Sequence, residues 1–182
     1  LAERLNRTDI HFVAELVQNA EDAGLRWDRP EVHLRFLIDA EKIVAQNDGY
    51  PFDDEDVRSI CRAAASSKRH AENQIGFMGI GFKSVFKIAS APEVHSNGFH
   101  FRLERYIYPA WLDAPSSLPH RDMQSAFVLP LKAEVDVERL ASQFNHIDPA
   151  MLLFLNKLKS IEIDNQVTGK IHVIEARAAA DG

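Results

Sequence analysis

The sequence predicts an α+β fold, a two-layer sandwich with helices on one face of a largely antiparallel mixed sheet. Residues 31–39 alternate between apolar and polar side chains, whereas residues 9–23 have helical spacing. Hairpin-like strand pairs are mixed with separate helices, which is typical of α+β proteins. A chain of 182 residues, 46% of them hydrophobic, can bury one good core but is short for two. We therefore expect residues 1–182 to form a single domain.

Local patterns locate the individual elements. The first helix is expected from Asp9 to Ala23, with Gly24 as a left-handed terminator, and Asp53 or Asp54 can cap a helix to about Ala65. Residues 109–122, with three prolines and two adjacent serines, are expected to form a surface loop. The predicted strands are 31–39, 43–46, 93–96, 99–104, 125–131, 160–164 and 170–174, and the remaining helices are 81–88, 137–144 and 149–159, with the apolar residues of 152–158 in the core.

Composition limits the partners of the chain. A net charge of −6 argues against nucleic acid or an anionic membrane as the main partner. No apolar run approaches the roughly 18–20 residues of a membrane span. The single cysteine, Cys61, excludes an internal disulfide, and the eight histidines show no metal-ligand spacing on one element. We expect a cytoplasmic chain and, because it starts at Leu1 without a methionine, a fragment whose partners include other domains of a larger protein.

A polar stripe on the first helix is the first candidate site segment. Glu15, Asn19 and Asp22 are spaced by four and three residues, which places them on one face. Such a stripe is by itself typical of a solvated helix face. The functional alternative is a carboxylate base beside an amide oxygen suited to Mg²⁺. The opposite, apolar side of this helix is expected to face the core: Phe12, Val13, Leu16, Val17 and Ala20.

A turn and a glycine-rich coil are the second and third segments. Asn47, Asp48 and Gly49 form a plain turn or, alternatively, supply an oxygen that accepts from an exocyclic base amine. Three glycines within six residues at 76–81 precede a helix, an arrangement that can wrap a phosphate. The P-loop pattern is absent because Phe82 stands where its lysine should be. The dinucleotide pattern is absent because the glycine order is reversed.

Together and in this order, the segments resemble the nucleotide site of the GHKL ATPases. Residues 15–23 (ELVQNAEDA) resemble the N-box of that family, and residues 47–49 (NDG) resemble its first glycine box. Residues 66–68 (SSK) and 76–84 (GFMGIGFKS) resemble the phosphate box of the heat-shock 90 chaperones. Fuller phrases, such as GIGFKSVF and LLFLNKL, are similar to the sacsin-like subgroup. The resemblance implies a Bergerat-type sandwich that binds ATP and Mg²⁺.

The resemblance also assigns roles to residues. Glu15 would orient or deprotonate the attacking water, Asn19 would hold Mg²⁺, and Asp22 would line the pocket. The base would be contacted from Asn47, Asp48 and Gly49 and, through water, from Ser125. The phosphates would be met by a segment that acts partly as a short lid and includes Ser67, Lys68, Gly76, Gly79, Ile80, Gly81 and Phe82.

Two departures from the family pattern leave alternatives open. The adenine-reading aspartate is replaced by Asn47, whose amide suits either adenine or a guanine-like edge, unless a shift brings Asp48 into the pocket. The second glycine of this box is missing, and Pro51 lies nearby. The leading hypothesis is therefore a slow ATPase module of a chaperone-like or regulatory protein, with nucleotide-dependent homodimerisation possible. The alternatives are a non-hydrolysing nucleotide sensor or a degenerate interaction domain and, less favoured, a histidine kinase.

Overall fold

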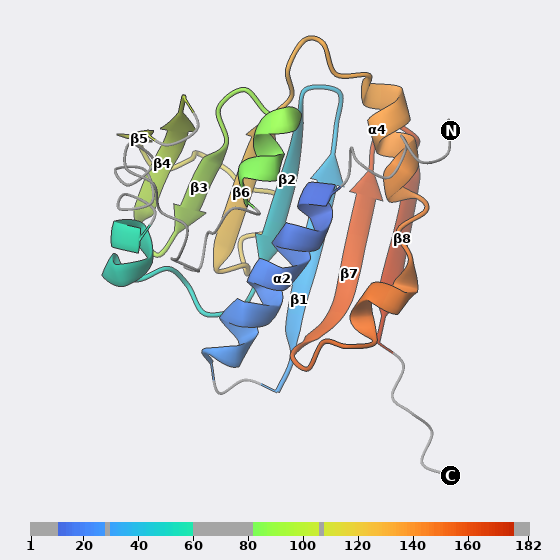
Figure 1. Cartoon of the computed structure of the whole chain (residues 1–182), viewed down its shortest axis with the longest axis horizontal. Helices are drawn as coiled ribbons and strands as arrows, with labels where there is room; N and C mark the ends of the chain where they lie inside the picture. Colours follow the sequence, from blue (N-terminus) through green and yellow to red (C-terminus); the bar gives the residue numbers. More distant parts are fainter. Residues whose placement is uncertain (1–10, 28–29, 60–81, 106–107, 177–182) are drawn as a thin grey trace, which may run out of the picture.

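The computed structural model describes residues 11–27, 30–59, 82–105 and 108–176. Eight strands form one sheet in the order β5-β4-β3-β6-β2-β1-β7-β8 (Figure 1). β1 and β7 pair in parallel, and every other neighbouring pair is antiparallel. This confirms the α+β class with a largely antiparallel mixed sheet. The strands are β1 Val32–Ile38, β2 Lys42–Asn47, β3 Glu93–Ser96, β4 Phe99–Glu104, β5 Tyr108–Trp111, β6 Ser125–Pro130, β7 Leu158–Asn165 and β8 Lys170–Glu175.

The helices lie over one face of this sheet (Figure 1). They are the α-helices α2 (His11–Leu25) and α4 (Val137–Phe144) and the 3₁₀ helices η1 (Phe82–Lys87) and η2 (Pro149–Leu152). Residues 54–59 are also helical. The carboxylate of Asp53 accepts from the backbone N–H groups of Glu55 and Asp56 at 2.9 and 3.0 Å, so the predicted N-cap is confirmed.

The core lies between α2 and the central strands. The predicted apolar side of α2 is confirmed, since its members are all at most 4% exposed. The Phe144 ring of α4 lies 6.1 Å from Phe12 and 5.4 Å from Phe36, centroid to centroid. Each fully buried side chain of this size contributes about 1.5–3 kcal/mol. Packing on both α2 and α4 therefore fixes how the helical layer sits on the sheet.

The prediction for Gly24 was wrong. The residue lies inside α2, which continues to Leu25, and does not end the helix in a left-handed conformation. A Cβ atom at Gly24 would come within 2.6 Å of Lys157 Cβ and 2.8 Å of Val32 Cγ2. The glycine is therefore needed for close packing of the helix against the starts of β1 and β7.

Two further local predictions were only partly right. Instead of a helix over 149–159, one 3₁₀ turn is followed by β7 from Leu158, and Leu153 and Phe154 are 71% and 88% exposed rather than core. The predicted loop at 109–122 begins with strand β5, at the edge of the sheet. Pro109 fits there because an edge strand tolerates a residue without an N–H group.

A buried carboxylate explains why the chain leaves the helical conformation before β7. Glu21 of α2 is 3% exposed, and its oxygens accept from the backbone N–H groups of Asn156, Lys157 and Leu158 at 2.8–3.2 Å. In a continuous helix over 149–159 those donors would bond to preceding carbonyl groups instead. The contact ties α2 to the start of β7.

The other face of the sheet is partly covered by the connection between β5 and β6. Gln46 exchanges two hydrogen bonds with the backbone of His120, at 2.8 and 3.1 Å.

Two histidines lie opposite each other on β3 and β4: the Nδ1 atoms of His95 and His100 are 3.2 Å apart. Burial lowers the pKa of His95 despite the neighbouring Glu93 carboxylate. The sequence did not indicate this pair because the two histidines lie on different strands.

Among the described residues, no group of three or more His, Cys, Asp or Glu side chains is arranged to hold a metal ion. In the same part of the chain, no helix has the length and apolar character needed to cross a membrane.

Replacing Glu21 with glutamine should destabilise the domain by about 2–3 kcal/mol, because three backbone donors lose a charged acceptor. The free energy of unfolding, measured by urea titration, provides the test. The exposed Glu134→Gln serves as the control and should change it by less than about 0.5 kcal/mol. Equal stability of the two variants would show that the Glu21 carboxylate does not fasten α2 to β7.

Candidate functional site

The helix and the turn predicted to share a site lie against each other. The backbone N–H of Tyr50 donates to the carbonyl oxygen of Ala23, near the end of α2, at 3.0 Å. A Cβ atom at Gly49 would lie 2.6 Å from Ala23 Cβ, so only glycine allows this approach. Asn19 is one helical turn before Ala23. The structure therefore brings the first two predicted segments together.

A row of buried polar side chains lies at the strand ends beside this turn. Asn47 of β2 is paired with Ser125 of β6, which is paired in turn with Ser96 of β3. All three residues are 3% exposed, and the two serine Oγ atoms are 2.7 Å apart. By alternation with the buried Ala45 and Phe127, Asn47 and Ser125 face the helical layer. The structure therefore places Asn47 and Ser125, both assigned to the base side by the resemblance, next to each other.

The structure also separates Asn47 from Asp48. Asp48 Oδ1 accepts from the backbone N–H of His33 at 2.6 Å, which directs this carboxylate towards the start of β1. Asn47 Oδ1 accepts from the Gly49 N–H at 3.1 Å, the geometry of an Asx turn. The hypothesis that Asp48 shifts into the place of Asn47 is therefore not supported by this arrangement.

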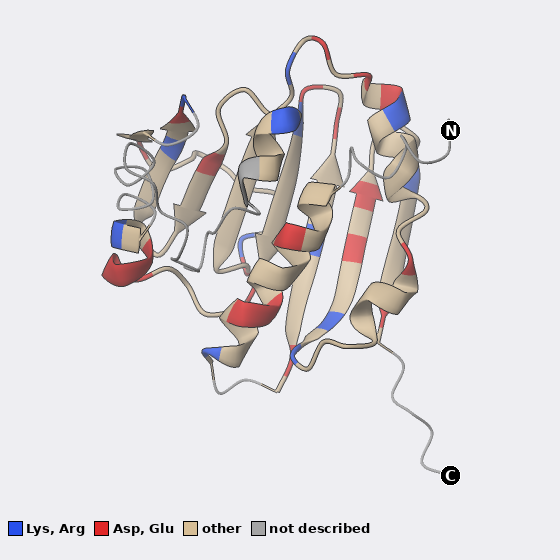
Figure 2. Ribbon diagram, in the orientation of Figure 1, with Lys and Arg blue, Asp and Glu red and all other residues tan. Residues whose placement is uncertain are grey.

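The polar stripe of α2 combines exposed and buried groups. Glu15 and Asp22 are half-buried, and Asp22 Oδ1 accepts from Gln18 Nε2 at 2.8 Å. Asn19 is 9% exposed, and its Nδ2 is one of the buried side-chain atoms without a hydrogen-bond partner among the described residues. Figure 2 shows acidic positions along this helix. A buried amide without a partner is rare and requires an explanation.

A second such atom lies on the neighbouring element. Ser84 Oγ, on η1, is also buried without a partner in the described part of the chain. η1 packs against α2, as Figure 1 shows. Two unsatisfied polar atoms on adjacent elements suit a ligand that accepts hydrogen bonds, such as a phosphate group.

Most of the predicted phosphate segment lies outside the described residues. This applies to Ser67, Lys68, Gly76, Gly79, Ile80 and Gly81. The backbone of Phe82 begins η1, beside α2, but its side chain is not described. The phosphate contacts of this segment therefore remain predictions.

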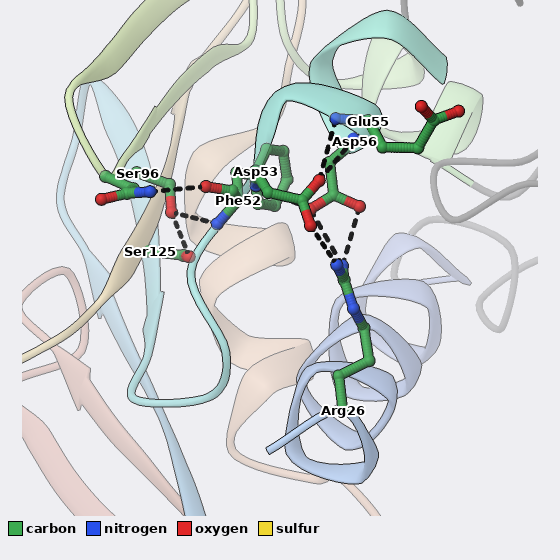
Figure 3. Close-up of polar contacts among 8 residues, drawn as sticks. Arg26, Phe52, Asp53, Glu55, Asp56, Ser96 and Ser125 are labelled. Carbon is green, nitrogen blue, oxygen red and sulfur yellow. Dashed lines mark hydrogen bonds and ion pairs between the residues drawn. The ribbon is translucent and has the colours of Figure 1, made fainter.

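Sequence reasoning missed a cluster of charged groups at the end of α2 (Figure 3). Arg26 Nη1 donates to both oxygens of Asp56, at 2.8 and 2.9 Å, and Nη2 donates to Asp53 Oδ2 at 2.7 Å. The guanidinium also lies 4.8 Å from the centroid of the Tyr50 ring. The spacing of Asp53 and Asp56 as residues i and i+3 was the available signal, because these carboxylates also form a reciprocal helix cap.

The comparisons with known proteins define the class of this α+β domain. The Sacsin domain family matches residues 4–103, more than half of the chain. The chain therefore belongs to the Sacsin domain family. It is similar to Protein NO VEIN of Arabidopsis thaliana, with 32% identity over 198 residues. That match covers 96% of this chain but 7% of the relative, so the chain spans a small part of the relative's length. The family match includes α2 and the turn at 47–49 but not Ser125.

Replacing Gly49 with alanine should destabilise the protein by about 1–3 kcal/mol, because the new methyl group would clash with Ala23 Cβ at 2.6 Å. Thermal unfolding measures the change. Gly98→Ala is not a suitable control because that glycine has a positive φ of 81°, so the exposed Ser90→Ala is used instead. A Gly49→Ala variant with the melting temperature of Ser90→Ala would contradict the close contact.

Proposed function

We propose that the domain is a Mg²⁺-dependent ATP-binding and slowly hydrolysing module of the GHKL kind, with a Bergerat-type sandwich. In this proposal its nucleotide state switches the conformation of a larger chaperone-like or regulatory protein. The observation that carries the proposal is the buried Asn19 amide, which lacks a partner among the described residues, on a helix whose end contacts the Asn47–Gly49 turn. The resemblance of both segments to the GHKL boxes supports the same conclusion.

The donor set fits a magnesium triphosphate. Mg²⁺ in such sites is held by few protein ligands together with substrate phosphates and water, so a cluster of protein carboxylates is not needed. Asn19 would hold the ion through Oδ1, while its Nδ2 can donate to a phosphate oxygen. Mg²⁺ itself would neutralise charge on the phosphates. Ser84 Oγ is a further donor on the adjacent η1.

Glu15 would act on the attacking water. It lies one helical turn before Asn19 on the same face of α2 and is half-buried. Its carboxylate would orient the water and accept its proton. Hydrolysis in this kind of site depends mainly on positioning and on electrostatic stabilisation of the phosphoryl group, with no covalent intermediate.

Asn47 would contact the base. Its Oδ1 already accepts one hydrogen bond, from Gly49, but a carbonyl oxygen has two lone pairs and can accept a second from an exocyclic amine. Ser125 is held beside it by β-sheet pairing and would reach the base through water. Because Gly49 has no side chain, the turn can pack directly against Ala23 near the end of α2.

The second candidate function is a nucleotide sensor that binds but does not hydrolyse. If the domain has also lost nucleotide binding, it is a degenerate interaction domain. Two sequence observations favour this candidate: asparagine replaces aspartate at position 47, and Pro51 lies near the position of the missing second glycine. Both changes affect the base side and leave Glu15 and Asn19 in place. Measurement of binding and turnover in the same protein separates these functions.

Replacing Glu15 with alanine should abolish steady-state ATP hydrolysis and leave the Kd for MgATP within about twofold, because Glu15 acts on water rather than on the nucleotide. Phosphate release and calorimetry are measured on the same samples, with Glu134→Ala as the control. Binding without Mg²⁺-dependent turnover in the wild type would make the domain a sensor. No binding of ATP, ADP or GTP would leave an interaction domain.

A further inference from the structure

We infer that Arg26 is a positioning residue: its contacts with Asp53 and Asp56 hold the Asn47–Gly49 turn in place against α2. We call these three residues the Arg26 clasp. The inference rests on the proposed nucleotide site and adds to it a residue that helps to hold its two halves together. One half, on α2, carries Glu15 and Asn19. The other half is the base-contacting turn.

The clasp joins two segments that are far apart in the sequence. Arg26 follows directly after α2, and its two carboxylate partners flank the first turn of the helix at 54–59. Both terminal nitrogens of the guanidinium are engaged, one with each aspartate (Figure 3). Bidentate contacts of a planar guanidinium fix the orientation of the carboxylates as well as their distance from it. The same guanidinium lies over the ring of Tyr50, within the connecting segment.

The segment between the clasp and the turn is short and is held on both sides. Tyr50 donates to Ala23 of α2, while Phe52 donates its backbone N–H to Ser96 Oγ at 2.9 Å. The carbonyl oxygen of Phe52 accepts from Asn97 Nδ2 at 3.0 Å. Because only three residues separate Gly49 from Asp53, a displacement of Asp53 is transmitted to the turn. Ser96 also contacts Ser125, so the base side as a whole depends on this placement.

Arg26 also prevents repulsion within the segment. The carboxylates of Asp53 and Asp56 are brought together by their reciprocal capping contacts, and the guanidinium neutralises them. The pKa values agree with this role. The Asp56 N–H and, to a lesser extent, Arg26 lower the pKa of Asp53. Burial would lower the pKa of Arg26, but the contacts with the two aspartates raise it overall. Without Arg26 the two carboxylates would repel each other, and the segment would lose its ionic contact with the end of α2.

The clasp combines exposed and buried groups: Arg26 and Asp53 are partly exposed, but the Asp56 side chain is only 7% exposed. Loss of Arg26 removes a cation from a buried carboxylate and is therefore expected to lower the melting temperature. The positioning role is distinguished by the affinity of the variant at a temperature where it is folded. A structural role would lower the melting temperature and leave the affinity of the folded protein unchanged.

The test compares Arg26→Gln with Arg102→Gln. Arg102 forms an ion pair of 2.7 Å with Glu104 on β4, which makes it a control for the loss of an exposed arginine ion pair away from α2. Calorimetric Kd values for MgATP are measured at a temperature where every variant is folded, together with melting temperatures. Arg26→Gln should raise the Kd about tenfold, since small misplacements of binding groups have large effects. Arg102→Gln should leave the Kd unchanged, and Arg26→Gln should have the lower melting temperature of the two because its partner Asp56 is buried.

Two further variants guard against a failure of Arg26→Gln to fold. Arg26→Lys keeps the charge but cannot make the two-pronged contact, and Asp56→Asn keeps the shape but removes one charge. Both should also raise the Kd. Unchanged Kd values in folded Arg26 and Asp56 variants, with ATP binding in the wild type, would overturn the clasp. A wild type that binds no nucleotide would instead overturn the proposed function on which the clasp rests.

Discussion

The close contact between Gly49 and Ala23 is the constraint on which the candidate site depends. Without a side chain at Gly49 the turn after β2 can lie directly against the last turns of α2, and the hydrogen bond from Tyr50 to Ala23 fixes that contact. The turn carries the groups proposed to contact the base, and the helix carries Asn19 one turn before Ala23. A larger residue at position 49 would move the turn away from the helix that carries Asn19, and the proposed nucleotide site needs both.

The end of α2 is fastened on two opposite sides. Glu21 accepts the backbone N–H groups at the start of β7, and Arg26 binds the carboxylates that cap the helix at 54–59. Because β7 pairs in parallel with β1, the first contact connects the helix to the centre of the sheet. The second connects it to the segment at 50–53, where the Phe52 N–H donates to Ser96, which in turn contacts Ser125. The polar positions of α2 therefore divide into those that hold the helix and those that face the candidate site.

The sequence predicted well those helices and strands in which the spacing of apolar residues matches the side chains that are buried. The apolar side of α2 and the bounds of the strands β3 and β4 are as expected. The resemblance implied that Asn47 and Ser125 serve one site, and the structure pairs them on neighbouring strands. The match to the Sacsin domain family shows the class of protein, and the chemistry of the candidate site is a proposal.

The remaining features depend on contacts between residues that are distant in the sequence. Residues 149–159 have a helical pattern, but the chain turns into β7 because Glu21, more than a hundred residues earlier, takes its N–H groups. Gly24 looks like a helix terminator, yet it is needed for the approach of Lys157 and Val32. No local pattern encodes either partner. For the same reason the Arg26 clasp was visible in the sequence only as a spacing of two aspartates.

The most direct test of the account is a calorimetric titration of MgATP into the wild type, Asn47→Ala and Asp48→Ala. Asn47 lies on the helical side of the sheet, whereas Asp48 is bound to His33. We expect Asn47→Ala to weaken binding by about tenfold, as for loss of one hydrogen bond of about 1.4 kcal/mol, and Asp48→Ala to weaken it less. Undiminished binding by Asn47→Ala, or no binding by the wild type, would contradict a nucleotide site between α2 and this turn.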